Sequence, residues 1–310
     1  MELTQLLYGL GAIAYSLACP DLRAGQPLSE TLAALPGLPT PVSVFYNATQ
    51  LPNEQKSNVT KFLNQALALS TSWQIHQYFQ DQRITQQLFP ALFTQPAGFV
   101  IPFSPFDDLF FVGQDFVSFW AYNTGDGLVV TDALDFADEI QEVMLPALSK
   151  FGFSGADVKH VIITHEHLDH TAEQKVLRFG KTWFQVVLTP GHTPGCLSLI
   201  FPLTAKNGTE RQVAGLNGGT SIPRSPSDKA ARVRSHYKLA DAAKARGVDT
   251  LISNHQIADH ALFNSDLLKH AEVNSANPFM IGKKDYYNYL QILALCTKVQ
   301  AARLRHPGMK

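Results

Sequence analysis

Cysteine and charged residues are both scarce in this chain. Only 3 of its 310 residues are cysteine, which argues against a zinc–thiolate cluster or a disulfide framework. Charged residues make up 16% of the chain and the formal net charge is −1, whereas soluble domains average about 25% charged residues. Nucleic acids and anionic membranes attract chains with a clear excess of Lys and Arg. We therefore expect neither of them to be a main partner.

The N-terminal apolar stretch is too short to cross a bilayer. It runs over thirteen residues, from Leu6 to Ala18, whereas a spanning helix needs about 20. Its length and the small residues at its end are typical of a secretory signal peptide, although Glu2 stands where such peptides carry Lys or Arg. The alternative is a buried N-terminal helix in a cytosolic protein. We expect residues 1–18 to be a signal peptide, the protein to be secreted, and no stable membrane span.

Three Asn-x-Ser/Thr triplets agree with secretion. They lie at Asn47, Asn58 and Asn207 and are glycosylation acceptors in a secreted eukaryotic protein. Such triplets also arise by chance, so each one alone carries little weight. Together with the N-terminal stretch, they predict a secreted glycoprotein.

Residues 19–105 are predicted to form an N-terminal extension that is partly helical. Prolines and other helix breakers are frequent over residues 34–52, which favours a loop or an extended arm. Residues 57–81 show helical spacing, and Ser57 or Asn58 is a candidate cap for the start of the helix. The apolar stripe consists of Phe62, Ala66, Leu69 and Trp73. We expect this helix to pack against the main domain, which begins near residue 106.

The main domain shows the alternation of strands and helices that is typical of an α/β fold. Asn123-Thr124-Gly125-Asp126-Gly127 is a hairpin turn, because its glycines can adopt positive φ. The elements expected before residue 165 are strands at 109–113, 117–122 and 128–131, a helix at about 136–151, and a strand at 159–164.

Four candidate metal ligands follow the last of these strands within six residues. The run is His165-Glu166-His167-Leu168-Asp169-His170. Side chains alternate along an extended segment, so His165 and His167 can point to the same side. Imidazole and carboxylate ligands suit zinc, which they bind at roughly 2.0–2.2 Å. The alternative is a solvated His-rich loop, which a compact His-x-His-x-Asp-His run at a strand end does not favour.

The chain resembles the metallo-β-lactamase fold family over roughly residues 106–310. The first half of the resemblance is the stretch FVG…VSFWAYNTGDGLVVTDAL…VIITHEHLDH. The second half is Thr189-Pro190-Gly191-His192-Thr193-Pro194-Gly195, which is similar to the second metal loop, and Leu251-Ile252-Ser253-Asn254-His255, which is similar to the third. The resemblance is strongest to the lactamase subclass, and to related secreted fungal proteins, in which all ligands are His and Asp.

This resemblance implies an αββα sandwich and a site for two zinc ions. One zinc site would be formed by His165, His167 and His192, and the other by Asp169, His170 and His255. The implied enzyme is a metallo-hydrolase in which a metal-bound hydroxide opens amide or ester bonds of small-molecule substrates, such as lactams or lactones. Asp169 would act in catalysis as well, by steering the hydroxide.

Three residues and one short stretch, none of them among the implied ligands, invite an interpretation. Asp132, at the end of a strand, is either an acceptor that fixes the metal loop or a cap for the following turn. Residues 214–219 hold no Asp, Glu or Cys, so the bridging carboxylate and the cysteine of other family members are missing, which supports the all-His/Asp variant. We interpret Asn217 as a substrate contact or a plain turn residue, and Cys196 as a packing residue.

One segment departs from the family pattern. His192 follows His170 after only 22 positions, whereas a strand–helix–strand unit takes about 30 residues or more. Thr171-Ala172 stands where the family has a pair of glycines. We expect a βα element to be missing after residue 170, which should uncover one face of the sheet and loosen the pocket. The alternative function is therefore a non-catalytic, truncated member of the fold family with weak or single metal binding.

Overall fold

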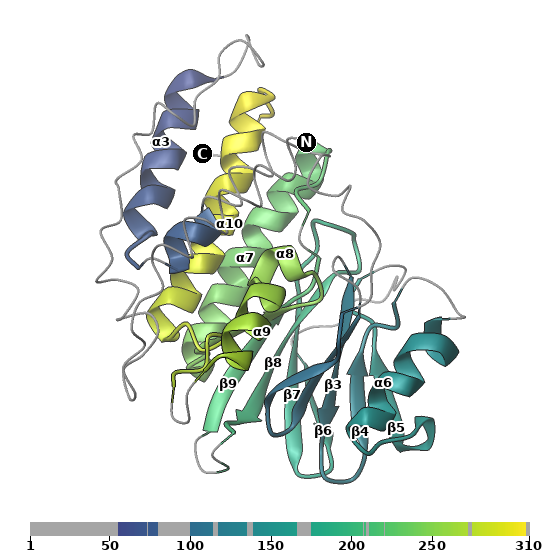
Figure 1. The fold of residues 1–310 in the computed structure, drawn as a ribbon. Helices are drawn as coiled ribbons and strands as arrows, with labels where there is room; N and C mark the ends of the chain where they lie inside the picture. Colours follow the sequence, from purple (N-terminus) through teal and green to yellow (C-terminus); the bar gives the residue numbers. More distant parts are fainter. Residues whose placement is uncertain are drawn as a thin grey trace, which may run out of the picture.

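The computed structural model describes two five-stranded β-sheets that pack face to face, with helices on both outer sides (Figure 1). The described residues are 55–72, 74–79, 100–113, 117–134, 139–165, 175–206, 208, 211–219, 221–271 and 275–307. This helix–sheet–sheet–helix layering confirms the predicted α/β sandwich.

The first sheet contains the predicted hairpin strands. Its order is β1-β2-β3-β4-β5, and every neighbouring pair is antiparallel except β4 and β5, which are parallel. The strands are β1 (Phe103–Phe106), β2 (Leu109–Gly113), β3 (Ser118–Asn123), β4 (Leu128–Thr131) and β5 (Val158–Ile162). The helical connection from β4 to β5 contains a π-helical turn at Ile140–Met144 followed by α6 (Leu145–Lys150). Pro146 lies in the first turn of α6, where its missing N–H is tolerated.

The second sheet has the order β10-β9-β8-β7-β6. The strands are β6 (Lys175–Phe179), β7 (Thr182–Leu188), β8 (Leu197–Thr204), β9 (Arg211–Asn217) and β10 (Thr250–Ser253). All neighbours are antiparallel except β9 and β10, which α7 (Pro226–Arg246) connects as a parallel pair. α7 ends at Gly247, which has the left-handed φ of 68° that glycine adopts readily.

Alternation along the strands explains why both sheets are covered on both faces. Phe111 and Trp120 point into the core between the sheets, whereas Val112 and Phe119 pack toward α6. Phe184, on β7 of the second sheet, packs in the same core between the sheets. The other face of the second sheet packs against α7 and α10 (Lys283–Arg303). A further helix, from the N-terminal extension, belongs to the same layer.

That helix is α3 (Lys56–Leu69), and it lies along α10 (Figure 1). Its buried residues are Val59, Phe62, Leu63 and Ala66. The prediction of one helix over 57–81 is wrong, because α3 ends at Leu69 and a separate helical segment covers residues 74–79. The Ser70 hydroxyl donates to the Ala66 carbonyl at 3.1 Å, the kind of local bond that competes with helical hydrogen bonding. The predicted cap is also wrong, since the N-cap is Gln55.

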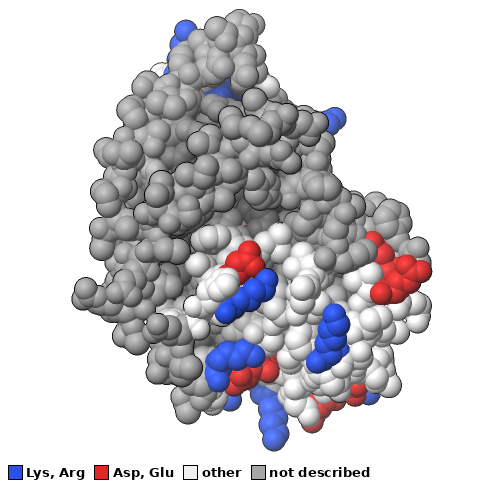
Figure 2. Space-filling model, in the orientation of Figure 1, with Lys and Arg blue, Asp and Glu red and all other residues white. Residues whose placement is uncertain are grey.

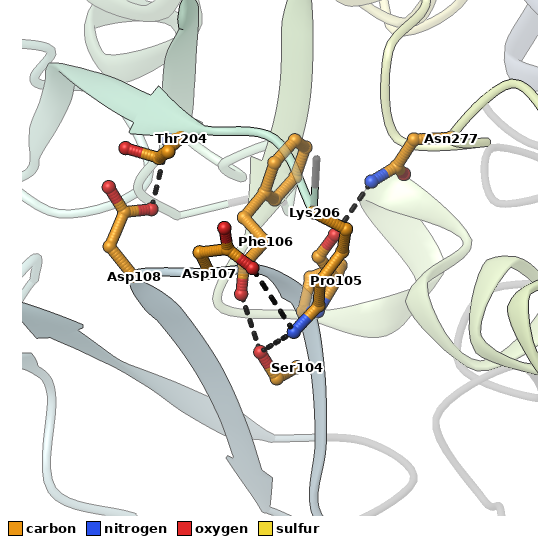
Figure 3. Close-up of polar contacts among 8 residues, drawn as sticks. All are labelled: Ser104, Pro105, Phe106, Asp107, Asp108, Thr204, Lys206 and Asn277. Atoms are coloured by element: carbon orange, nitrogen blue, oxygen red, sulfur yellow. Dashed lines mark hydrogen bonds and ion pairs between the residues drawn. The ribbon is translucent and has the colours of Figure 1, made fainter. Parts of the chain in front are cut away.

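A cluster of polar contacts joins the two sheets at one end of the sandwich (Figure 3). The turn between β1 and β2 presents Asp108, whose Oδ1 accepts from the Thr204 backbone N–H at 3.1 Å, and Lys206 Nζ donates to Ser104 Oγ at 2.9 Å. On the other side of the turn, Asn277 donates to the Pro105 carbonyl at 2.7 Å. Thr204 ends β8, so this cluster lies at the opposite end of β8 from the His192 loop.

The edges of the two sheets carry exposed apolar residues near the shortened segment. Val161 on β5 is 51% exposed, Ile163 just after it 39%, and Val176 on β6 43%. This exposure agrees with the expected uncovering of one sheet face. Residues 166–174, between β5 and β6, lie outside the described residues, so the missing βα element stays a prediction.

Charges of both signs are interspersed on the described part of the face in Figure 2. This pattern agrees with the net charge of −1. Within the described ranges, no helix is both long and apolar enough to span a membrane.

We expect Phe62→Ala to lower the free energy of unfolding by roughly 3–5 kcal/mol, because it leaves a cavity between α3 and α10. Chemical denaturation measures this change. The matched control is Gln65→Ala on the exposed side of α3, which should stay within about 0.5 kcal/mol of the native protein. Equal stability of the two variants would show that α3 does not dock on α10.

Candidate functional site

Three of the six predicted ligands meet at one end of the sandwich. His165 follows β5, His192 lies in the loop between β7 and β8, and His255 follows β10. The ring centroids of His165 and His192 are 5.3 Å apart, and those of His165 and His255 are 5.8 Å apart. Residues that are far apart in the sequence and come from both sheets are thus brought together.

The other three predicted ligands, His167, Asp169 and His170, lie outside the described residues. Within the part of the chain that the structure describes, no group of three or more His, Cys, Asp or Glu side chains could hold a metal ion. Imidazole is a common zinc ligand, but in this structure the three described imidazoles do not by themselves form a metal site. A complete site would also need ligands from the segment 166–170.

Backbone contacts between the sheets explain this convergence. The Leu197 N–H at the start of β8 donates to the Thr164 carbonyl at 2.8 Å, which ties the end of β5 to the His192 loop. Gly218 makes the approach sterically feasible, since a Cβ there would lie 2.0 Å from the Leu197 carbonyl oxygen. Gly219 has a φ of 71°, and a Cβ there would lie 2.9 Å from the His192 Cβ. This pair of glycines lets β9 end directly beneath the loop.

Cys196 is a packing residue, as predicted. Its side chain is fully buried, and Thr193 contacts its Sγ through both the backbone N–H and the hydroxyl, at 3.4 and 3.2 Å. Burial raises the pKa of the thiol. Because metals bind the thiolate, a buried thiol with a raised pKa is a poor ligand.

Neither interpretation of Asn217 matches its place in the structure. It is the last residue of β9 and is buried, so it is a strand residue and not a turn residue. Its Oδ1 accepts from the Ser198 hydroxyl at 3.4 Å. With 1% of its surface exposed, its side chain does not face solvent where a substrate would approach.

Asp132 anchors the strand end that carries His165. Its Oδ1 accepts from the Thr164 backbone N–H and its Oδ2 from the Thr164 hydroxyl, both at 2.7 Å. Asn254 Nδ2 donates to the same Oδ2 at 3.2 Å. Burial raises the pKa of the Asp132 carboxyl, and the hydrogen bonds from Thr164 and Asn254 oppose this rise. Of the two interpretations of Asp132, these contacts favour the acceptor that fixes the loop.

The backbone of Asp132 has a left-handed φ of 64°. Most residues with a side chain avoid this conformation, although Asp and Asn tolerate it better than others. The conformation turns the chain sharply at the end of β4, where the carboxylate receives the donors from β5. A strained residue held at such a position is typical of functional sites.

Thr164 and Asn254 complete the contacts around His165, and the sequence analysis missed both. His165 Nδ1 lies 3.0 Å from the Thr164 hydroxyl oxygen and 3.2 Å from Asn254 Nδ2. A signal for them was present, because each residue directly precedes a candidate ligand: Thr164 precedes His165, and Asn254 precedes His255.

Residues 112–179 match the family model described as the metallo-beta-lactamase superfamily. The fold is the metallo-β-lactamase fold. This likeness extends to solved structures of subclass B3 enzymes, as in BJP-1 of Bradyrhizobium japonicum, which is 20% identical with a TM-score of 0.50 over 61% of this chain and 89% of the other. No curated protein sequence matches the chain.

Two further metallo-β-lactamases give a similar result. FEZ-1 from Legionella gormanii is 17% identical, with a TM-score of 0.51 over 63% of this chain and 93% of its own. The enzyme from Cronobacter sakazakii is also 17% identical, with a TM-score of 0.51 over 66% of this chain and 96% of its own. At such identities the likeness establishes the metallo-β-lactamase fold and not a substrate.

We expect Asp132→Ala to lower the free energy of unfolding by roughly 1–3 kcal/mol, because it leaves the buried Thr164 donors without their acceptor. Chemical denaturation at neutral pH measures the loss. Asp126→Ala, in the exposed turn between β3 and β4, serves as the matched control and should be nearly neutral. If both variants are equally stable, Asp132 does not anchor the strand end.

Proposed function

We propose that this chain is a zinc-dependent hydrolase of amide or ester bonds, with its active site around His165. The observation that carries the proposal is the convergence of His165, His192 and His255 from three strand ends, one in the first sheet and two in the second. Imidazole is a common zinc ligand, and such closely spaced imidazoles are the donor set that zinc prefers. The fold and the superfamily match support the same reaction class.

Two zinc ions are expected in this proposal. His165, His167 and His192 would hold one of them, and Asp169, His170 and His255 would hold the other. Lewis-acid activation of a water molecule and of a carbonyl group is the chemistry that bound zinc supplies. The other roles in the proposed reaction belong to residues of this chain.

These residues orient the ligands and control protons. Asp132 and Thr164 hold the strand end that carries His165. Asp169 is proposed to orient the attacking water and to accept its proton. Cys196 stays a neutral thiol because burial raises its pKa, so it does not compete for the metal.

Small molecules with a lactam or lactone ring are the proposed substrates. The fold is shared with enzymes whose names describe them as metallo-β-lactamases, and a strained cyclic amide or ester suits hydrolysis by an activated water. The near-neutral net charge of the chain agrees with a small-molecule substrate rather than a polyanion.

A non-catalytic role is the second candidate, and a specific observation favours it. β5 ends at Ile162 and β6 begins at Lys175, so few residues between the two strands are available to cover the pocket. The exposed side chains of Val161, Ile163 and Val176 at the two sheet edges are what a missing covering element would leave. This candidate predicts at most one weakly bound zinc ion and no hydrolysis.

Zinc content is the first measurement, made by elemental analysis of protein purified without chelator. We expect about two equivalents per chain, with a clear reduction in His192→Ala and in Asp169→Ala. His270→Ala is the matched control, because His270 is exposed at the end of α9 (Ala261–Lys269). A folded protein that contains no zinc would refute the hydrolase proposal.

Activity is tested next with reporter lactams and lactones. We expect turnover that a chelator abolishes and added zinc restores, and that falls in Asp169→Ala. Turnover that persists after removal of all metal would contradict the proposed chemistry. One weakly bound zinc ion without turnover would support the non-catalytic candidate.

We also propose that the protein is secreted. The apolar stretch Leu6–Ala18 and the three triplets at Asn47, Asn58 and Asn207 support this proposal. Expressed in eukaryotic cells with its own N-terminus, the chain should accumulate in the medium and lose mass on treatment with a glycosidase. Retention in the cytosol at the full chain mass would contradict it.

A further inference from the structure

We propose that the Thr164 hydroxyl is a positioning group that fixes His165 in the tautomer with its hydrogen on Nδ1. The other ring nitrogen, Nε2, then carries the lone pair that a metal ion needs. The inference rests on the proposed function, because it assigns His165 as a ligand. It goes beyond that function by naming the residues that prepare the ligand before any metal binds.

The hydrogen-bond count around Thr164 leads to this tautomer. A hydroxyl has one hydrogen to donate and two lone pairs to accept with. The Thr164 hydrogen goes to Asp132 Oδ2 at 2.7 Å, the shortest contact in the group. One lone pair accepts from Asn254 Nδ2 at 3.0 Å. The second lone pair faces His165 Nδ1 at 3.0 Å, and it is satisfied only when Nδ1 carries a hydrogen.

The orientation of the Asn254 amide is determined by the same carboxylate. Its Nδ2 lies 3.2 Å from Asp132 Oδ2, so the reverse orientation would place the amide oxygen against a carboxylate oxygen. The two amide hydrogens are then directed to Asp132 and Thr164. The Asn254 amide is therefore oriented so that its N–H donates a hydrogen bond to the Thr164 hydroxyl oxygen.

The opposite tautomer makes a poorer set of contacts. With its hydrogen on Nε2, His165 would accept from Asn254 Nδ2 at 3.2 Å but would set two lone pairs against each other at the shorter Thr164 contact of 3.0 Å. Thr164 is fully buried, so water cannot compensate for an unsatisfied lone pair there.

The arrangement is thus a carboxylate–hydroxyl–imidazole relay. A metal-binding histidine usually donates its second ring N–H to a carboxylate, a carbonyl group or water, which fixes the tautomer and the ring orientation. Here Thr164 stands between the imidazole of His165 and the carboxylate of Asp132. The three residues come from β4 and from the segment after β5, and Asn254 adds support from the second sheet.

The test compares Thr164→Val, which keeps the shape but removes the hydroxyl, with Thr164→Ser, which keeps the hydroxyl. The matched control is Thr250→Val, since Thr250 on β10 is also fully buried and its hydroxyl donates to Asp249 Oδ1 at 2.9 Å. Nitrogen NMR of histidine-labelled, zinc-free protein at mildly alkaline pH reports the tautomer of each ring. The His165 signals are assigned by their loss in His165→Gln.

We expect the Nδ1–H tautomer of His165 in the native protein, in Thr164→Ser and in Thr250→Val. In Thr164→Val the ring should shift toward the Nε2–H tautomer, accepting from Asn254. Zinc affinity, measured by competition with a chromophoric chelator, should fall by about 10–100-fold in Thr164→Val only. A general loss of stability would not change the tautomer selectively.

Two results would overturn the inference. One is the Nε2–H tautomer in the native zinc-free protein, which decides the question even if Thr164→Val fails to fold. The other is an unchanged tautomer in a folded Thr164→Val protein. A native protein that takes up no zinc would refute the proposed hydrolase, while the tautomer measurement would still decide this inference separately.

Discussion

A partly buried carboxylate at the seam between the two sheets organises the end of the molecule that holds the candidate site. Burying a charge is costly unless its oxygens receive hydrogen bonds. Asp132 meets this requirement with donors from Thr164 on the first sheet and Asn254 on the second. The ends of β4, β5 and β10 therefore cannot move apart without leaving these groups unsatisfied. The candidate ligands His165 and His255 each follow directly after one of the donors, so their separation is set by the same contacts.

The hairpin strands of the first sheet could be anticipated because they are encoded locally, whereas the grouping of the candidate ligands was implied by the family resemblance. Short apolar runs marked β2 to β4, and the glycine-rich turn at 123–127 joins β3 and β4 into a hairpin. The break in the predicted helix at Ser70 could not be anticipated from the apolar stripe, because the stripe continues past it. There a side-chain hydrogen bond to the Ala66 carbonyl competes with the helix.

The supporting residues of the site were missed for a different reason. Thr164 and Asn254 are 90 positions apart, and their contact forms only when the two sheets pack together. Neither residue type signals metal chemistry by itself. The left-handed backbone conformation of Asp132 was likewise not predictable from the local sequence. It accompanies the hydrogen bonds between the Asp132 carboxylate and Thr164 at the end of β5.

The deletion predicted from the sequence would fall between β5 and β6, the edge strands of the two sheets. Exposed apolar side chains lie on and beside these strands. The Leu197 N–H donates to the Thr164 carbonyl and the Asn254 amide donates to Asp132, so the His192 loop and the end of β10 are held to the first sheet. The end of β5 that receives these contacts is also where the chain continues into residues 166–174.

The docking of α3 on α10 determines when the chain can finish folding. The Gln55 N–H donates to the Ala302 carbonyl at 2.9 Å, and Phe62 packs among residues of α10. On the ribosome, α3 emerges long before α10, so its apolar face has nowhere to pack until α10 has been synthesised. The helical layer over the second sheet can therefore assemble only at that stage, and until then the nascent chain exposes the apolar face of α3.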